Sequence, residues 1–351
     1  MKIDHVHFYV RNAARTRDWF IHNIGFKAIA SRVNQHTQTE VIALNSACFI
    51  LSSPLDSKSV VAKYLNCYSE GVVDIAFRVR SIRSVIDHGK NFGVKILQSP
   101  RRYQSAQGEF QLAQVTGWQA LNHTLIEIKA GKFDYCLPNF RLESSKTCIN
   151  YQSQISNIDH IVLNVAQGKL KPAVEFYQAL FGFKIQQSFN IQTEKSGLFS
   201  QALIDQEREL QFNINEPISP SSQIQEFIDL NGGSGIQHLA LRSQNLISDM
   251  LQMQQHRVQF LSVPNAYYLD LGRKFWLNKE ELEAVTKLQI LVDRGKNKTQ
   301  SLLMQIFTQP IFEQRTFFLE FIERRKAAEG FGQGNFKALF SAIEECQSKI
   351  N

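Results

Sequence analysis

Residues 158–165 read IDHIVLNV and residues 3–10 read IDHVHFYV, so the chain carries one strand-like pattern twice. Each stretch is followed by a helix-like segment that ends in Gly-Phe-Lys, at Gly25 and at Gly182. Similarity of this kind between distant parts of a chain is the signature of a repeated architecture. The fold is therefore expected to be built twice from one unit.

Two further matches follow in the same order. Residues 71–78 (GVVDIAFR) correspond to residues 235–242 (GIQHLALR), and residues 124–128 (TLIEI) correspond to residues 317–321 (FFLEF). In each half the pattern is a strand, a helix and several strands, followed by a second such unit. The sequence therefore predicts an α+β fold of two tandem modules, each made of paired βαβββ units that form an open barrel-like sheet.

The domain boundaries follow from the repeat and from local composition. Residues 1–140 are expected to form the N-terminal module, residues 141–156 a polar linker, and residues 157–351 the C-terminal module. After the glycine-rich residues 330–334, apolar residues recur at helical spacing at Phe336, Leu339, Phe340 and Ile343. This spacing predicts a C-terminal amphipathic helix, which we interpret as a lid over an apolar pocket.

Composition is that of a folded globular protein. The chain has 351 residues, 43% hydrophobic and 20% charged, which is long enough for two cores and too apolar for disorder. The net charge of +7 comes from scattered basic residues that match no nucleic-acid module, so a nucleic-acid partner is not expected. The five cysteines form no CxxC motif and no stretch reaches membrane-spanning length. We expect a cytoplasmic protein with reduced thiols and no membrane partner.

Three polar residues in apolar, strand-like surroundings suggest a metal site. His160 and His238 each begin an apolar run, and Glu320 lies in residues 316–322 (TFFLEFI), where an unpaired carboxylate would be costly. Any one of them alone would more often be a structural residue. Two imidazoles and one carboxylate together suit a six-coordinate iron(II), with positions left open for a bidentate substrate and dioxygen.

Strand alternation predicts which side chains share a face with these residues, because residues two apart point the same way. The expected cavity is lined by amides, one hydroxyl and phenyl rings, which suits an aromatic ligand with a polar end. Its predicted members are Val162, Asn164, Ser200, Asn213, Asn215, Gln305, Phe307 and Phe318.

The N-terminal half carries His5, Asp74 and Glu127 at the positions that the matched stretches assign to the metal ligands. A carboxylate replaces the second imidazole there, and the flanking polar positions are not repeated. We therefore expect the N-terminal module to be metal-free.

These residues resemble the 4-hydroxyphenylpyruvate dioxygenase family of the vicinal oxygen chelate superfamily, over nearly the whole chain. Seven motifs in family order carry the resemblance: residues 159–162 (DHIV), 196–198 (SGL), 214–217 (INEP), 235–240 (GIQHLA), 291–294 (LVDR), 303–308 (LMQIFT) and 330–336 (GFGQGNF).

The resemblance implies iron(II) held by His160, His238 and Glu320, and an aromatic 2-oxo acid and dioxygen as substrates. It implies that 4-hydroxyphenylpyruvate is converted to homogentisate and carbon dioxide by a homo-oligomer, and it leaves open whether the product feeds tyrosine catabolism or prenylquinone biosynthesis. The roles it implies are catalytic for Ser200, Asn215, Gln305 and Phe336, and substrate-binding for Val162, Gln223, Phe307, Phe318, Asn335, Leu339 and Phe340.

Two alternatives differ in the chemistry of the same pocket. A 4-hydroxymandelate synthase would use the same metal and substrate, but the matching position in that enzyme is aliphatic, so Asn215 favours the dioxygenase. A non-catalytic binding module is disfavoured by the intact triad. One residue departs from the family pattern: Asn213 stands where many members have proline, and we expect it to change pocket shape and inhibitor binding.

Overall fold

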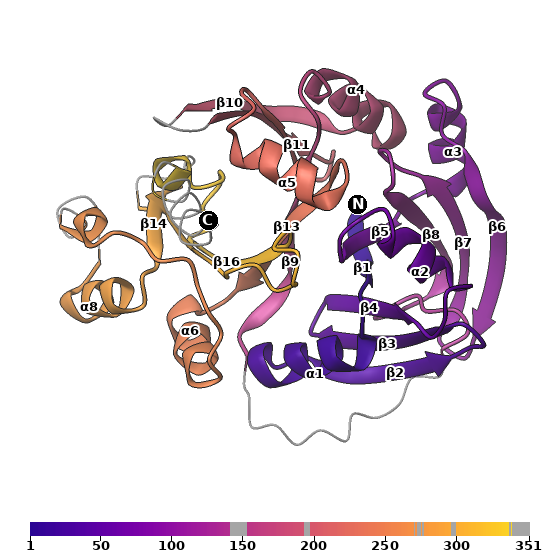
Figure 1. Ribbon diagram of the computed structural model, residues 1–351, viewed down its shortest axis with the longest axis horizontal. Helices are drawn as coiled ribbons and strands as arrows, with labels where there is room; N and C mark the ends of the chain where they lie inside the picture. Colours follow the sequence, from indigo (N-terminus) through magenta and orange to yellow (C-terminus); the bar gives the residue numbers. More distant parts are fainter. Residues whose placement is uncertain are drawn as a thin grey trace.

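The computed structural model describes residues 1–140, 153–192, 197–269, 271, 275, 277–295, 300–336 and 338. They contain two eight-stranded sheets, with strand orders β2-β3-β4-β1-β5-β8-β7-β6 and β10-β11-β12-β9-β13-β16-β15-β14. Each strand of the second sheet has the number of its counterpart in the first sheet plus eight, so the two strand orders are the same. The repeat in the sequence is therefore a repeat of the fold, and Figure 1 shows the two sheets as neighbouring curved halves of the molecule.

Each half is a pair of βαβββ units, as predicted. The N-terminal half contains β1 (Lys2–Tyr9), α1 (Ala13–Ile24), β2 (Lys27–Val33), β3 (Thr37–Leu44), β4 (Ala47–Pro54), α2 (Val60–Leu65), β5 (Gly71–Arg78), α3 (Ile82–Lys90), β6 (Ile96–Ser105), β7 (Gly108–Thr116) and β8 (Asn122–Gly131).

The C-terminal half repeats this order, with η1 and α8 added inside its second unit and η2 added after its last strand. It contains β9 (Ile155–Asn164), α4 (Leu170–Phe181), β10 (Lys184–Gln192), β11 (Gly197–Ile204), β12 (Gln211–Pro217), α5 (Gln223–Asn231), β13 (Gly235–Ser243), α6 (Leu246–Gln255), η1 (Asn265–Tyr268), α8 (Lys279–Lys287), β14 (Leu291–Arg294), β15 (Leu302–Phe307), β16 (Phe318–Arg325) and η2 (Gln333–Asn335).

The repeated Gly-Phe-Lys ends the first helix of each half. Gly25 follows α1 with a φ of 90°, and Gly182 follows α4 with a φ of 69°. These left-handed conformations favour glycine, and they turn the chain from the helix into the next strand. At the other end of α1, the Asn12 side chain accepts a hydrogen bond from the amide of Arg15.

Strand register defines which residues of the two halves are equivalent. His5 lies opposite Ala76 in the first sheet, as His160 lies opposite Ala240 in the second. Ala240 then faces Glu320 on β16, whereas Ala76 faces Thr124 on β8. Thr124, three residues before Glu127, is therefore the counterpart of Glu320. The predicted match of Glu127 to Glu320 was wrong, because similar apolar runs do not fix a register that backbone hydrogen bonds set.

One apolar core spans both halves and holds them together. The rings of Phe8 and Phe317, one from each half, meet edge to face with centroids 5.3 Å apart. Between the halves, His123 on β8 contacts the Tyr177 hydroxyl on α4 at 3.1 Å. Figure 1 shows α4 beside α3 at this junction.

Each concave sheet face is covered by the segment that follows its last strand. In the N-terminal half, Phe133 and Leu137 pack onto inward-facing residues of the sheet. In the C-terminal half, Ala328 and Phe331 do so, but a cavity remains beneath them. The two faces share a backbone plan and differ in what fills them.

The predicted domain boundaries stay predictions, because most of the expected linker lies outside the described residues. β9 begins at Ile155, two residues before the expected start of the C-terminal module, while residues 141–152 lie outside the described residues. The predicted lid helix, from Leu339 onward, also lies outside them. Among the described residues, no helix combines the length and apolarity needed to cross a membrane.

Candidate metal centre

Three adjacent strands bring His160, His238 and Glu320 to one point. They lie on β9, β13 and β16, and their ligand atoms fall within 4.8 Å of one another. The Glu320 Oε2 atom is 3.2 Å from His160 Nε2 and 3.5 Å from His238 Nε2. Within the described parts of the chain, this is the one group of His, Cys, Asp or Glu side chains close enough together to hold a metal.

Burial and mutual charge together set the protonation of these groups. Burial would raise the pKa of Glu320, but the two facing imidazoles outweigh it and lower that pKa to about 2. Burial would lower the pKa of His160, but Glu320 and Asp159 raise it to about 9. Burial keeps the pKa of His238 below its usual value. At neutral pH the metal-free centre thus holds a carboxylate, a protonated His160 and a neutral His238.

This donor set fits a divalent transition metal. Two imidazole nitrogens and one carboxylate oxygen converge from adjacent strands of one sheet, and a bound metal cation would replace the proton that Glu320 and Asp159 favour on His160. The cavity in front of them leaves room for further ligands. Sites of this composition, with open positions, are typical of oxygen-activating iron enzymes.

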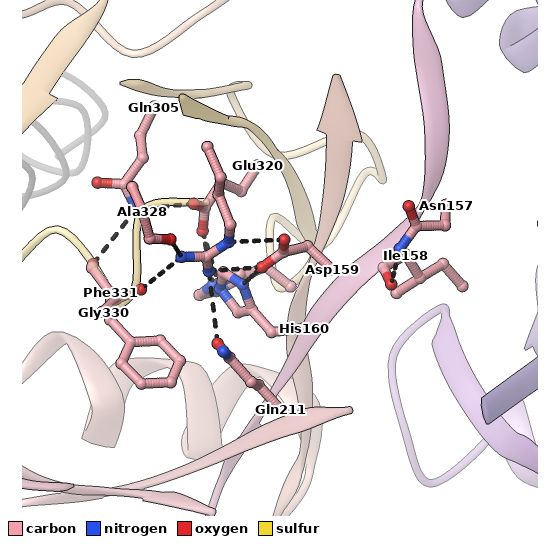
Figure 2. Close-up of polar contacts among 12 residues, drawn as sticks. Asn157, Ile158, Asp159, His160, Gln211, Gln305, Glu320, Ala328, Gly330 and Phe331 are labelled. Carbon is pink, nitrogen blue, oxygen red and sulfur yellow. Dashed lines mark hydrogen bonds and ion pairs between the residues drawn. The ribbon is translucent and has the colours of Figure 1, made fainter. Parts of the chain in front are cut away.

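A buried ion pair orients His160 from behind. Asp159 Oδ1 lies 3.0 Å from His160 Nδ1, and Arg324 donates to both oxygens of Asp159 at 2.6 and 2.8 Å. Figure 2 shows Asp159 beside His160, on the side away from Gln305. An imidazole whose Nδ1 is held by a carboxylate presents Nε2 to a metal and is more basic as a ligand.

Arg324 also fixes the segment that covers the site. Its guanidinium donates to the carbonyls of Ala328 and Gly330 at 3.1 and 2.8 Å. These two contacts hold the backbone leading to Phe331, whose ring packs edge to face on His160 at 5.7 Å. One side chain therefore supports both the metal ligand and its cover.

Gln305 links the ligand Glu320 to the same segment. Its Nε2 donates to Glu320 Oε1 at 2.8 Å and to the Phe331 carbonyl at 3.3 Å, while its Oε1 accepts from Asn335 Nδ2 at 3.0 Å. A Cβ at Gly332 would overlap the Gln305 amide, so glycine is needed there for the close approach.

A cavity opens from the three ligand residues. The structure brings nearly all predicted site residues to its wall: Val162, Ser200, Asn215, Gln223, Gln305, Phe307, Phe318, Asn335 and Phe336 join His160, His238 and Glu320. Asn164, which was also predicted to line the cavity, does not: it is buried behind the wall, where its side-chain oxygen accepts a hydrogen bond from Asn215. Leu339 and Phe340 lie outside the described residues.

Gln237 and Phe331 line the cavity although the sequence did not single them out. Alternation places Gln237 on the opposite face from His238, but a β-bulge between Ile236 and His238 breaks the alternation. Gln237 is the extra residue of this bulge, and it is turned into the cavity. Phe331 belongs to the glycine-rich turn, and its edge-to-face contact with His160 depends on the folded cover.

The N-terminal counterpart of the centre satisfies its own polar groups. Asp74 accepts hydrogen bonds from the backbone and hydroxyl of Thr124 and from Gln114. His5 pairs with Asp4 at 2.7 Å, as His160 pairs with Asp159. The same scaffold therefore carries a self-contained polar cluster in one half and a converging donor set in the other.

A family model and two curated relatives place the chain among known proteins. A model of the Glyoxalase/Bleomycin resistance protein/Dioxygenase superfamily matches residues 157–279. The 4-hydroxyphenylpyruvate dioxygenase of Caenorhabditis briggsae is 33% identical to this chain, covering 99% of it and 92% of that protein. The one of Dictyostelium discoideum is 32% identical, covering 98% and 97%.

A solved structure shares the whole fold. A triple mutant of 4-hydroxymandelate synthase from Streptomyces coelicolor superposes with a TM-score of 0.86 and 24% identity, covering 99% of this chain and 98% of that one. Both modules and their relative arrangement are thus those of a known architecture.

Proposed function

Because the chain belongs to the 4-hydroxyphenylpyruvate dioxygenase family, a family of metal-dependent dioxygenases, we propose that it converts 4-hydroxyphenylpyruvate and dioxygen to homogentisate and carbon dioxide. In this proposal His160, His238 and Glu320 hold iron(II). The observation that carries it is the cavity that opens from this triad, lined by amides, one hydroxyl and phenyl rings.

The bound iron would supply the redox chemistry, activating dioxygen beside a chelated 2-oxo acid. The protein's own residues bind and orient the ring. Phe307 and Phe318 form an apolar wall next to the ligands, with ring centroids 6.2 Å apart. Asn215 uses its nitrogen to bind Asn164 Oδ1 at 3.1 Å, which leaves its oxygen to accept from a ring hydroxyl. Anchored at both ends, the ring is held in one orientation.

Gln305 and Phe331 have a different part in the proposal. Gln305 keeps Glu320 in place through its 2.8 Å hydrogen bond, and Phe331 closes the cavity over His160. A closed apolar cover keeps bulk water from a reactive centre. Ser200, which lies opposite Asn215 in the β11–β12 register, adds a second polar group at the far end of the cavity.

The runner-up is a 4-hydroxymandelate synthase, because that enzyme shares the fold. It oxidises the side chain, whereas a dioxygenase that forms homogentisate oxidises the ring. An amide that binds the ring hydroxyl would hold the ring itself toward the metal, so Asn215 favours ring hydroxylation.

The test is the identity of the product. The protein is loaded with iron(II) without oxygen, mixed with 4-hydroxyphenylpyruvate and then with dioxygen, and the aromatic product is identified by chromatography. We expect homogentisate with an equal amount of carbon dioxide. 4-Hydroxymandelate would overturn the assigned reaction and the role of Asn215, and a metal-loaded protein that consumes no dioxygen would overturn the substrate.

The metal affinity should depend on pH in a direction that the protonation of the centre sets. Since the pKa of His160 is about 9, a metal must displace its proton at neutral pH. Loss of one proton makes the apparent affinity rise about tenfold per pH unit from pH 7, and the rise should flatten near pH 9. Competition with a chelator, using cobalt(II) as a stable stand-in, would measure this. An affinity that is constant over that range would show that His160 is already neutral.

Three expectations stay predictions. They are a homo-oligomeric state, a cytoplasmic location, and a supply of homogentisate to tyrosine catabolism or to prenylquinone biosynthesis.

A further inference from the structure

Asn213 has a polar group that the fold leaves unpaired. Its side chain is 8% exposed and lines the cavity, and its Oδ1 atom has no hydrogen-bond partner among the described residues. Burial of a carbonyl oxygen without a donor costs free energy, so such a group needs an explanation.

The N-terminal half shows that the fold does not require an amide at this position. On β4, Ile50 lies opposite His7, as Asn213 on β12 lies opposite Val162. Ile50 packs in an apolar cluster with Leu137. The same strand in the same architecture is therefore satisfied by an apolar residue. This comparison points to a ligand, and not to the scaffold, as the partner of Asn213.

The sheet register places Asn213 between the two ends of the cavity. It is level with Val162, which in turn lies opposite the metal ligand His238. Asn215 is two residues further along the same face, which is about 7 Å along the strand. A ligand with its head on the metal and its tip at Asn215 therefore passes Asn213 with its middle.

Two amide oxygens follow each other along this face of β12. The side-chain nitrogen of Asn215 donates a hydrogen bond to Asn164. In the proposed function, the side-chain oxygen of Asn215 accepts a hydrogen bond from the ring hydroxyl. Asn213 offers a second acceptor one step nearer the metal. Two acceptors in succession match two hydrogen-bond donors on neighbouring ring positions.

We propose that Asn213 is a specificity-determining residue whose side-chain oxygen accepts a hydrogen bond from a hydroxyl at ring position 3 of an aryl 2-oxo acid. The inference rests on the proposed function and refines its substrate class. The pocket then binds a ring with a hydroxyl at position 3 more tightly than a ring that has only hydrogen there. This contact adds to the one that Asn215 makes with the hydroxyl at position 4.

Binding of three arylpyruvates without oxygen tests this. The iron(II)-loaded protein is titrated with phenylpyruvate, 3-hydroxyphenylpyruvate and 4-hydroxyphenylpyruvate, none of which is a catechol that would chelate iron through its ring. We expect the 3-hydroxyl to tighten binding about five- to tenfold, the size of one hydrogen bond. In Asn213→Leu this gain should fall below about twofold, while the gain from the 4-hydroxyl persists; Asn215→Leu should show the reverse.

Ala202→Val serves as a matched control, because Ala202 lies opposite Asn213 on β11 and makes no side-chain hydrogen bond. It should weaken all three ligands alike. A 3-hydroxyl that gives no gain in the unaltered protein, as expected if an ordered water satisfies Asn213, would overturn the inference, and so would a gain that survives in Asn213→Leu. Homogentisate formation with no such gain would refute the inference alone. If none of the three ligands binds, the proposed function fails with it.

Discussion

The His160→Ala protein is expected to bind iron(II) at least about 100-fold more weakly than the unaltered protein and to consume no measurable dioxygen. Loss of a partner behind a metal ligand already costs about 10- to 100-fold in affinity, and loss of the ligand itself costs more. The Glu320 carboxylate would face only His238 across the centre. Metal affinity is measured by competition with a chelator, and activity with an oxygen electrode.

The internal repeat supplies a matched control. His5→Ala removes the equivalent histidine of the N-terminal half, together with an equivalent hydrogen bond to the preceding aspartate. Both variants lose the same structural contact, but only His160→Ala loses a proposed metal ligand. Equal losses of metal affinity in the two variants would refute the assignment of the centre.

The Arg324→Met protein is expected to be less stable by about 3–5 kcal/mol, because the buried Asp159 carboxylate loses the guanidinium that pairs with both of its oxygens. The side chains of Arg324 and Asp159 are 5% and 4% exposed. Among the described residues, Asp159 keeps only His160 as a side-chain partner. Chemical denaturation of the metal-free protein gives the free energy of unfolding. The variant should also bind metal more weakly, since His160 loses its orientation.

Two further variants distinguish the cost of leaving a charge buried from a general loss of stability. Arg78→Met removes the arginine that pairs with Asp4, but Asp4 keeps His5 Nδ1 and the amide of Cys136 as partners. Its cost should be clearly smaller. Combining Arg324→Met with Asp159→Asn removes the stranded charge, and should recover part of the lost stability. An unchanged unfolding free energy in Arg324→Met would contradict the role of the pair.

The local sequence pattern was enough to predict the repeat, the strands and the three residues that could hold a metal. His160 and Val162 point the same way because strands alternate, and an apolar run around Glu320 makes its carboxylate conspicuous. The cavity wall follows from the same rule at Asn213 and Asn215. These features depend on neighbours in sequence, so the sequence carries them.

Features that depend on pairing between distant strands could not be predicted. Gln237 enters the cavity through a bulge that only the β9–β13 register reveals. Thr124, and not Glu127, stands level with Glu320 because hydrogen bonds between β5 and β8 set the register. The Arg324–Asp159 pair joins residues 165 positions apart, and no local pattern marks arginine as the partner of an aspartate beside a histidine.

The two concave faces, alike in backbone and different in filling, have a consequence for how such a chain tolerates change. The cavity lowers the stability of the module that contains it, since it leaves polar atoms unpaired and space unfilled. In the N-terminal copy, Phe133 and Leu137 fill the concave face, and the core of this copy is continuous with that of the C-terminal copy. We therefore expect the N-terminal copy to contribute free energy of folding that offsets the cost of the cavity in the C-terminal copy. The C-terminal copy can then accept substitutions that reshape the pocket, as long as the shared core keeps the whole chain folded.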